Sequence, residues 1–300
     1  MLDQPIIVVQ GPTASGKTSL AIALAQYFQT EIISFDSRQF YTELSIGVAR
    51  PSSTELSSVK HHFVASHRVE DPLNAAQFAQ EAQQVLNQIR ETKGAVVLVG
   101  GSSLFADALL LGLDPLPHDV QVRAKWQKVL EQNGLSALQQ ALKELDPSYY
   151  VEVDTMNPLR LLRALEVTEL TGKSNLVLRK GARKDPDNLR RFTINWPRAE
   201  LYDRIECRVD QMLLEGLEQE ARLFYPEKQY LKALQTVGYQ EFFSYFSGVY
   251  DRNKAIEKVK QHSRNYAKRQ LTWLSRYKDI QVLDPKSELS LLDQALQKIG

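Results

Sequence analysis

The sequence predicts an α/β fold with a parallel sheet at its centre. Three runs rich in β-branched residues, at 5–10, 31–35 and 95–99, have the composition of strands that are buried on both faces. Helical stretches at 19–28 and 74–90 lie between them. Strands and helices that alternate in this way form a parallel sheet with helices on both of its faces.

The pattern changes after Gly112, where the chain is expected to leave this core. Residues 113–119 contain two prolines, which is typical of a domain boundary, and only helical patterns follow from 120 to about 171. We therefore expect two domains, a core of residues 1–114 plus 191–300 and a helical insertion of residues 115–190.

The second half of the chain returns to the core and then becomes helical. Residues 180–191 combine many basic side chains with Gly and Pro, so we expect a mobile loop there. Residues 192–196 have the composition of a further strand. From residue 199 the pattern is helical and ends near Leu283, which gives a helical C-terminal section.

The composition is that of an ordinary globular protein, with 43% hydrophobic and 24% charged residues. The net charge is only +1, so a nucleic-acid surface must come from local clustering of basic residues. The single cysteine, Cys207, excludes an internal disulfide and fits a reducing compartment. The first ten residues lack the basic region of a secretion signal, and no apolar run reaches the roughly 18 residues that span a bilayer. We expect a cytoplasmic, monomeric protein with no membrane partner.

Residues 11–18 (GPTASGKT) match the phosphate-binding pattern G-x-x-x-x-G-K-[ST] between a predicted strand and a predicted helix. Backbone N–H groups and the helix N-terminus point into one concavity in such a loop, which favours a diphosphate. Lys17 adds a charge, and the Thr18 hydroxyl is suited to ligate Mg²⁺. The core is therefore P-loop NTPase-like, with diphosphate-binding residues Gly11, Pro12, Thr13, Ala14, Ser15, Gly16, Lys17 and Thr18.

The carboxylate expected near this loop is Asp36. The strand at 96–99 ends in Gly-Gly-Ser-Ser without the acidic residue that holds Mg²⁺ in a typical ATPase, whereas Asp36 follows the strand at 31–35. Ligands lie at the carboxyl ends of the strands in open α/β sheets, so Asp36 can act as a general base on a bound nucleophile. The alternative role is a cap of the following turn.

Segments along nearly the whole sequence resemble the tRNA dimethylallyltransferase (isopentenyltransferase) family. The matching segments are GPTASGKT (11–18), DSRQFY (36–41), IGVARP (46–51), HHF (61–63), VGGSSLF (99–105), RLLRALEV (160–167), RIECRVDQML (204–213), TVGYQE (236–241) and YAKRQLTW (266–273). The resemblance implies dimethylallyl diphosphate as the donor and the exocyclic amine of adenosine 37 in tRNA as the acceptor. It also implies that the insertion helps to grip the anticodon stem-loop.

The resemblance assigns roles by matching position. It implies Asp36, Thr13 and Arg208 as catalytic residues, with Arg208 meeting the diphosphate. The residues that it implies to contact tRNA are Asp36, Ser37, Arg38, Gln39, Ser102, Arg123, Leu159, Arg160, Leu161, Leu162, Arg163, Gln235, Thr236, Val237, Gly238, Tyr239 and Gln240. The sequence departs from the family pattern at Ser102, where a threonine is common, at Phe105, where a tyrosine is frequent, and at Val48, where a threonine is usual.

Residues 258–278 carry seven Lys or Arg, no acidic residue and three aromatic residues. Basic groups bind RNA phosphates and aromatic rings stack on bases, so Lys268 and Arg269 are further candidates for tRNA binding. The alternative is an amphipathic helix with a solvated basic face, and we expect Trp273 to lie in the core. We expect Cys207 to be a packing residue and the pair His61-His62 to be structural, because adjacent side chains diverge and no third ligand is close in sequence.

Two other functions share part of this pattern. A small-molecule kinase would use the same phosphate loop, Asp36 and Mg²⁺, but nothing in the sequence resembles an adenine lid. A non-catalytic RNA-binding protein with a relict loop is disfavoured by the intact Lys17, Thr18 and Asp36.

Overall fold

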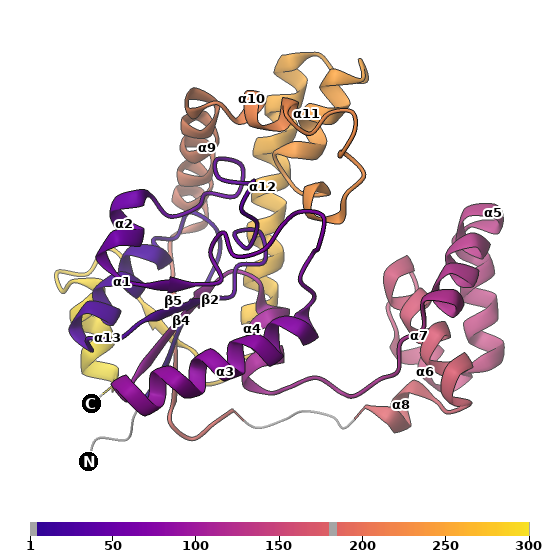
Figure 1. Cartoon of the computed structure of the whole chain (residues 1–300), viewed down its shortest axis with the longest axis horizontal. Coiled ribbons are helices and arrows are strands. Elements are labelled where there is room, and N and C mark those ends of the chain that lie inside the picture. The colour runs from indigo at the N-terminus through magenta and orange to yellow at the C-terminus, as the bar shows by residue number, and fades with distance from the viewer. Residues whose placement is uncertain (1–4, 180–184, 300) are drawn as a thin grey trace. The chain divides into compact units, whose positions relative to one another are not determined.

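The computed structural model describes residues 5–179 and 185–299 of the chain. It divides into two compact units, one formed by Met1–Gly112 with Asp185–Gly300 and the other by Leu113–Lys184. The first unit contains the sheet (Figure 1). The loop expected at 180–191 lies partly outside the described residues, at 180–184, and its last residues belong to a strand that begins at Leu189. The point at which the chain returns from the helical unit to the core therefore lies between residues 184 and 185, earlier than the expected residue 190.

The sheet consists of strands β1 (Ile6–Gln10), β2 (Ile32–Ser34), β3 (His61–His62), β4 (Val96–Gly100), β5 (Leu189–Ile194) and β6 (Gln281–Leu283). Within the described residues these six strands are all parallel, in the order β3-β2-β4-β1-β5-β6. In the central strand, Val8 pairs with Leu98 on one side and with Arg191 on the other. The predicted α/β class is confirmed.

The two edge strands are absent from the expectations above. β3 has two residues and β6 has three, which is too short for a periodic pattern. The helical expectation up to Leu283 is wrong at its end, because Leu283 is buried in β6 beside β5. His61 and His62 extend the sheet beyond β2, which is a structural position.

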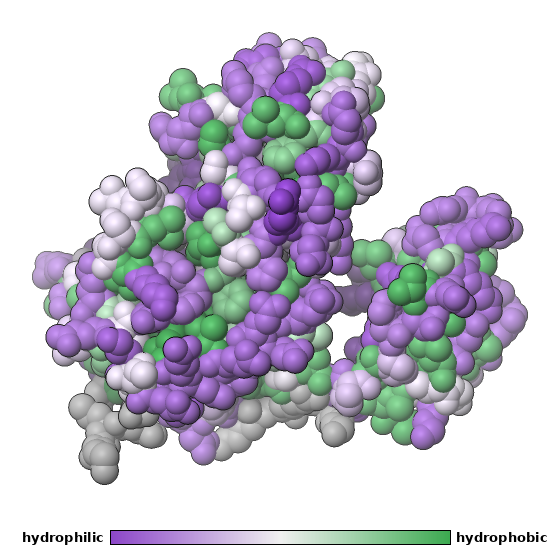
Figure 2. Space-filling view, viewed as in Figure 1, coloured by the Kyte–Doolittle hydropathy of each residue, from purple (hydrophilic) through white to green (hydrophobic). Residues whose placement is uncertain are grey.

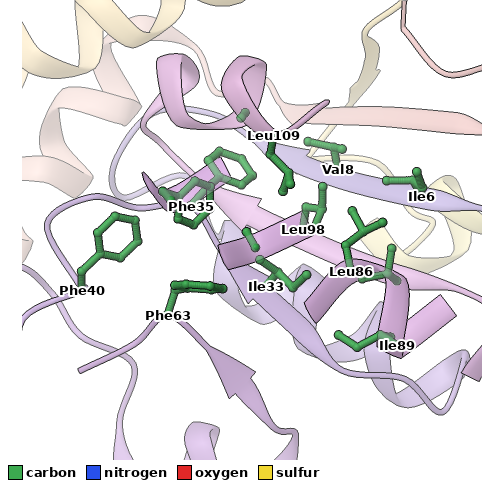
Figure 3. Close-up of a cluster of buried hydrophobic side chains, with 14 of the residues drawn as sticks. Ile6, Val8, Ile33, Phe35, Phe40, Phe63, Leu86, Ile89, Leu98 and Leu109 are labelled. Atoms are coloured by element: carbon green, nitrogen blue, oxygen red, sulfur yellow. The ribbon is translucent and has the colours of Figure 1, made fainter. Parts of the chain in front are cut away.

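Successive residues of β1 point to opposite faces of the sheet, as they do in any strand. Ile6 and Val8 pack with α3 (Ala75–Lys93) and α4 (Ser103–Leu110) in a cluster that also contains Phe40 and Leu98 (Figure 3). Ile7 packs on the other face with α1 (Lys17–Tyr27) and α13 (Leu291–Ile299). The continuous apolar run in β1 is thus explained by burial on both faces.

The rest of this unit is mainly helical. Its elements are α2 (Ser53–Ser58), α9 (Arg198–Glu215), α10 (Leu217–Arg222), the 3₁₀ turn η1 (Lys232–Leu234), α11 (Tyr239–Phe246) and α12 (Arg252–Leu274). Apart from α2, these elements pack around a third apolar cluster that includes Val209, Leu217 and Phe242. The Asp251 carboxylate caps the first turn of α12 by accepting from Lys254 N–H at 2.7 Å.

The helical unit contains α5 (Val120–Leu145), α6 (Pro147–Glu152), α7 (Pro158–Thr171) and α8 (Asn175–Leu178). Gly134 adopts φ 75° and kinks α5, while Asp146 and Asn157 cap α6 and α7, each directly before a proline. Figure 2 shows hydrophobic residues scattered among hydrophilic ones on the surface of this unit. None of the helices that the structure describes is both long and apolar enough to cross a membrane.

Candidate active site

The predicted phosphate-binding loop forms the turn between β1 and α1. Its backbone is left-handed at Ala14 (φ 63°) and at Gly16 (φ 94°), which directly precedes α1. Such a turn directs neighbouring N–H groups into one anion-binding concavity. Gly11 provides close packing, because a Cβ there would lie 3.2 Å from the Thr193 hydroxyl oxygen. We call residues 11–18 in this conformation the cradle.

Two side chains beyond β5 hold the cradle by its carbonyl groups. Trp196 Nε1 donates to the Ser15 carbonyl at 2.9 Å, and Arg204 Nε donates to the Ala14 carbonyl at 2.9 Å. The Arg204 guanidinium also lies over the Trp196 ring, 4.2 Å from its centroid. These two hydrogen bonds fix the carbonyls of Ala14 and Ser15 and so restrain the shape of the loop.

A third contact with the cradle comes from α12. The Thr13 N–H donates to Gln270 Oε1 at 3.0 Å, and Gln270 Nε2 donates to the Gly101 carbonyl at 3.0 Å. Gln270 is buried. It is absent from the expected site residues, although it lies in the YAKRQLTW segment, because a single glutamine carries no signal of long-range contact.

Two cations face the cradle. The Lys17 ammonium donates to the Pro12 carbonyl at 2.6 Å, and its burial lowers the pKa to about 8, an effect that Asp36 opposes and Arg208 reinforces. Arg208, on α9, donates from Nη1 to the Thr13 hydroxyl at 3.4 Å. Desolvation of the guanidinium where it lines the cavity, followed by the nearby charge of Arg204, lowers the pKa of Arg208, although the residue as a whole is exposed. The group stays charged at neutral pH. A diphosphate in the cradle would therefore meet positive charge from two sides.

Asp36 lies just beyond the end of β2 and lines the same cavity as the cradle and Arg208. Its Oδ1 accepts from Arg38 N–H at 3.3 Å, so the side chain also performs the turn-capping role weighed above. Gly100 permits this position, since a Cβ there would meet Asp36 N at 2.8 Å and Phe35 Cδ2 at 2.5 Å. Gly100, which ends β4, thus makes room for the backbone at Asp36.

An apolar pocket adjoins the cradle cavity. Thr13, Asp36 and Arg208 line both spaces. The apolar pocket continues along hydrophobic residues of α9, α10 and α12, namely Ile205, Val209, Met212, Leu217 and Val259. This pocket is absent from the sequence-based expectations, although the spacing of Ile205, Val209 and Met212 places them on one side of a helix.

Ser37, Arg38 and Gln39 follow Asp36 in the loop. The Ser37 N–H donates to Ser102 Oγ at 3.1 Å, and the two hydroxyl oxygens lie 2.9 Å apart, so Ser102 ties this loop to the start of α4. Arg38 lies over the Tyr266 ring, 5.2 Å from its centroid. Gln39 does not present both amide N–H groups to a ligand, because its Nε2 donates to the carbonyls of residues 48 and 49.

The segment 235–240 divides into exposed and buried residues. Gln235 and Gln240 are exposed, and their side chains are joined at 2.8 Å. Thr236 and Gly238 are buried, and Tyr239 is fully buried with its hydroxyl donating to Glu220 Oε1 at 2.6 Å. Tyr239 is a core residue, whereas Thr236, Gly238 and the half-buried Val237 line the apolar pocket. The expected tRNA contact at these positions stays a prediction.

In the helical unit, the residues expected at the RNA also divide by burial. Leu159 is 66% exposed and Arg160 is exposed at the start of α7. Leu161 and Leu162 are fully buried in the apolar core of this unit, so their side chains do not reach its surface, and the expected tRNA contact at these two positions stays a prediction. Exposed and buried positions follow each other along α7 because one side of the helix faces the apolar core and the other faces solvent.

Two arginines of the helical unit share one buried carboxylate. Arg163 Nη1 contacts Glu166 Oε2 at 2.9 Å, and Arg123 Nη1 lies 3.7 Å from the same oxygen. Arg163 also donates to the carbonyls of residues 116 and 117. Both guanidinium groups remain partly exposed, so they combine a structural contact with access to solvent.

The basic C-terminal segment forms most of α12, where Lys268 and Arg269 are exposed. Trp273 is half-buried rather than enclosed, and its Nε1 donates to Asp107 Oδ2 at 3.1 Å. The expectation of a packing role for Cys207 is wrong, because this residue is exposed on α9.

A family model described as IPP transferase matches residues 39–277 of the chain. The chain belongs to the IPP transferase family. Among relatives of this IPP transferase, tRNA dimethylallyltransferase 1 of Bacteroides fragilis is 42% identical, with 97% of each chain covered. The tRNA dimethylallyltransferase of Cytophaga hutchinsonii is 43% identical over 95% of this chain and 94% of its own. The first of these alignments spans 97% of the chain, so it includes the cradle and Asp36, which precede the matched family segment.

Solved structures agree with the fold of this IPP transferase. The full-length tRNA isopentenylpyrophosphate transferase from Bacillus halodurans is 30% identical with a TM-score of 0.73, covering 99% of this chain and 94% of its own. A eukaryotic dimethylallyltransferase described as acting on tRNA is 25% identical with a TM-score of 0.77, covering 93% of this chain and 73% of its own.

The donor set for a metal is sparse. Among the described residues no group of three or more His, Cys, Asp or Glu side chains is placed to hold an ion. Thr18 and Asp36 do line the cradle cavity together. A hydroxyl and a carboxylate beside a diphosphate fit Mg²⁺, which takes few protein ligands and uses substrate phosphates for the rest.

Proposed function

We propose that this IPP transferase moves a dimethylallyl group from dimethylallyl diphosphate to the exocyclic N6 amine of adenosine 37 in tRNA and releases diphosphate. One observation carries the proposal: an anion cradle and an apolar pocket meet at Thr13, Asp36 and Arg208. The donor has these two chemical parts, a diphosphate and a five-carbon hydrocarbon. The names of the relatives support the same reaction.

The residues at this junction match the needs of the reaction. The N6 lone pair forms a bond to the allylic carbon while the carbon–oxygen bond of the donor breaks. The electrons of the broken carbon–oxygen bond stay on the diphosphate, which leaves. Lys17 and Arg208, which lie about the cradle, stabilise this growing negative charge. Asp36 orients the amine and accepts the proton that N6 loses.

Mg²⁺ is proposed as the cofactor, held by Thr18 and the donor phosphates with Asp36 nearby. When bound, the ion adds positive charge beside the leaving diphosphate. The protein's own contribution is to bind and orient the donor, since Lys17 and Arg208 approach the same cavity from α1 and α9.

The acceptor site is proposed to be built from exposed polar and basic residues. Lys268 and Arg269 would bind phosphates of the anticodon stem-loop, and the helical unit would add Arg123, Leu159 and Arg160. Adenine must leave its stack to reach Asp36, at a cost of roughly a few kcal/mol. We place the monomeric enzyme in the cytoplasm together with this substrate.

The test is to incubate the protein with unmodified tRNA and either dimethylallyl diphosphate or ATP. A mass gain on the RNA equal to one dimethylallyl group, with the prenyl donor alone, is the expected result. A gain with ATP alone would favour the kinase alternative. Binding of tRNA without any mass gain from either donor would favour a non-catalytic RNA-binding protein.

A further inference from the structure

We propose that Gln270 is a positioning residue that holds the cradle in its diphosphate-binding shape; the inference deepens the proposed function and rests on it for the identity of the ligand. The residue lies on α12, more than 250 positions from the cradle in sequence. It does not line the cradle cavity or the apolar pocket, so it acts through its neighbours.

The Gln270 amide uses both of its ends. Oε1 accepts from Thr13 N–H at 3.0 Å, and Nε2 donates to the Gly101 carbonyl at 3.0 Å. Only 5% of the residue is exposed, so loss of the amide would leave buried backbone groups without these partners. An apolar side chain of similar length could fill the space but could make neither bond.

The first bond fixes the residue that joins the two parts of the donor site. Thr13 lines both the cradle cavity and the apolar pocket, and its hydroxyl accepts from Arg208. The Thr13 N–H is bound to Gln270, and the next two carbonyls, of Ala14 and Ser15, accept from Arg204 and Trp196. Three consecutive residues of the cradle are therefore fixed by side chains from outside it. Gln270 therefore completes the set of contacts that holds the loop in a shape suited to bind an anion.

The second bond explains a glycine. A Cβ at Gly101 would lie 2.0 Å from Gln270 Nε2. The nearest atom outside the Gln270 side chain would be the Gly11 carbonyl oxygen, at 3.5 Å. Gly101 is thus required because of Gln270, and this gives a way to test the contact from both sides.

The experiment is a double-mutant cycle with Gln270→Ala, Gly101→Ala and the double variant, read out by calorimetric binding of inorganic pyrophosphate. We expect each single variant to lose about tenfold in pyrophosphate affinity. The double variant should lose no more than Gln270→Ala, because the added methyl group no longer meets the amide. Gln261→Ala, an exposed glutamine on the same helix, serves as the control and should bind as wild type.

Binding of tRNA separates positioning from a general loss of structure. Filter-binding affinity for tRNA should stay within about twofold of wild type in all variants. Unchanged pyrophosphate binding by Gln270→Ala, multiplied losses in the double variant, or a parallel loss of tRNA binding would each overturn the inference. Because pyrophosphate binding requires no transfer, a wild-type protein that fails to prenylate tRNA would refute the proposed function and leave this result standing.

Discussion

The Thr13 hydroxyl accepts a hydrogen bond from Arg208 Nη1 at 3.4 Å, across 195 residues of sequence. This contact joins the cradle to α9, the helix that also supplies Ile205, Val209 and Met212 to the apolar pocket. In the proposed reaction, one helix would thus supply both a charge for the diphosphate and a wall for the hydrocarbon. A change on α9 can therefore affect either half of the donor.

Asp36 is expected to determine the chemical step. Asp36→Asn keeps the shape but cannot take a proton, so it should bind tRNA and donor yet transfer at least about a hundredfold more slowly. Asp36→Ala should be slower still, because it also loses the group that orients the amine. Single-turnover transfer with prebound tRNA measures this.

A matched control for Asp36 is Glu215→Gln, which changes another carboxylate in the wall of the cradle cavity. It should react like wild type. An Asp36→Asn variant within about threefold of wild type would leave only the capping role, for which asparagine is equally suitable.

Arg208→Ala and Lys17→Ala should slow transfer while tRNA affinity stays near normal, because both side chains act on the diphosphate. The loss of transition-state stabilisation is expected to be about 2–4 kcal/mol for each removed donor. Turnover and tRNA affinity are measured together. Arg198→Ala, on α9 but outside both cavities, is the control. A parallel fall in tRNA binding would contradict the assignment.

The lowered pKa of Lys17 predicts a pH dependence of donor capture. The ammonium form binds diphosphate and predominates in the free enzyme below a pH of about 8. kcat/KM for the donor should therefore fall as the pH rises through about 8. Lys17→Met should remove this limb of the profile, and an unchanged limb in that variant would assign it to another group.

Lys268 and Arg269 are expected to bind RNA phosphates. Replacing both by Glu should weaken tRNA binding and lower its salt dependence by up to about one unit of slope for each lost contact. Lys254→Glu, at the other end of the same helix, provides the control. If the double variant and wild type bound tRNA with equal affinity across a salt series, this face of α12 would be only solvated.

Glu220 is expected to stabilise the loop that precedes α2. Its carboxylate accepts from the N–H groups of residues 45, 46 and 47 and from the Tyr239 hydroxyl. Glu220→Ala should lower the free energy of unfolding by about 3 kcal/mol, because buried donors lose their partner. Glu218→Ala breaks a surface ion pair with Arg252 and should cost less than about 1 kcal/mol.

The Glu220 contribution should also depend on pH. Burial alone would raise the pKa of Glu220, but the hydrogen bonds from Gly47, Tyr239 and its other donors outweigh burial and lower it. Its stabilising effect is therefore present above the unfolded-state pKa and is lost as the pH falls through the lower folded-state pKa. Denaturant titrations should show the difference between Glu220→Ala and wild type shrinking in acid, and a constant difference would contradict this.

The sequence predicts the parts of the site that depend on local pattern. The cradle follows from a fixed spacing between a strand and a helix, and Asp36 follows from its place after a strand. Gln270 and Glu220 could not be found in this way, since their partners lie 257 and 173 to 175 positions away. Leu161 and Tyr239 show a different limit, because matching a motif gives the position of a residue but not its burial.

The contacts around the cradle also bear on the order in which the protein is made. Residues 11–18 are translated well before the side chains that hold them, Trp196, Arg204 and Gln270. A nascent chain released before α12 would carry the whole phosphate motif without the contact at Thr13. The protein is therefore expected to complete its donor site only after α12 has been synthesised, so that chains that stop before α12 would not compete for prenyl diphosphate.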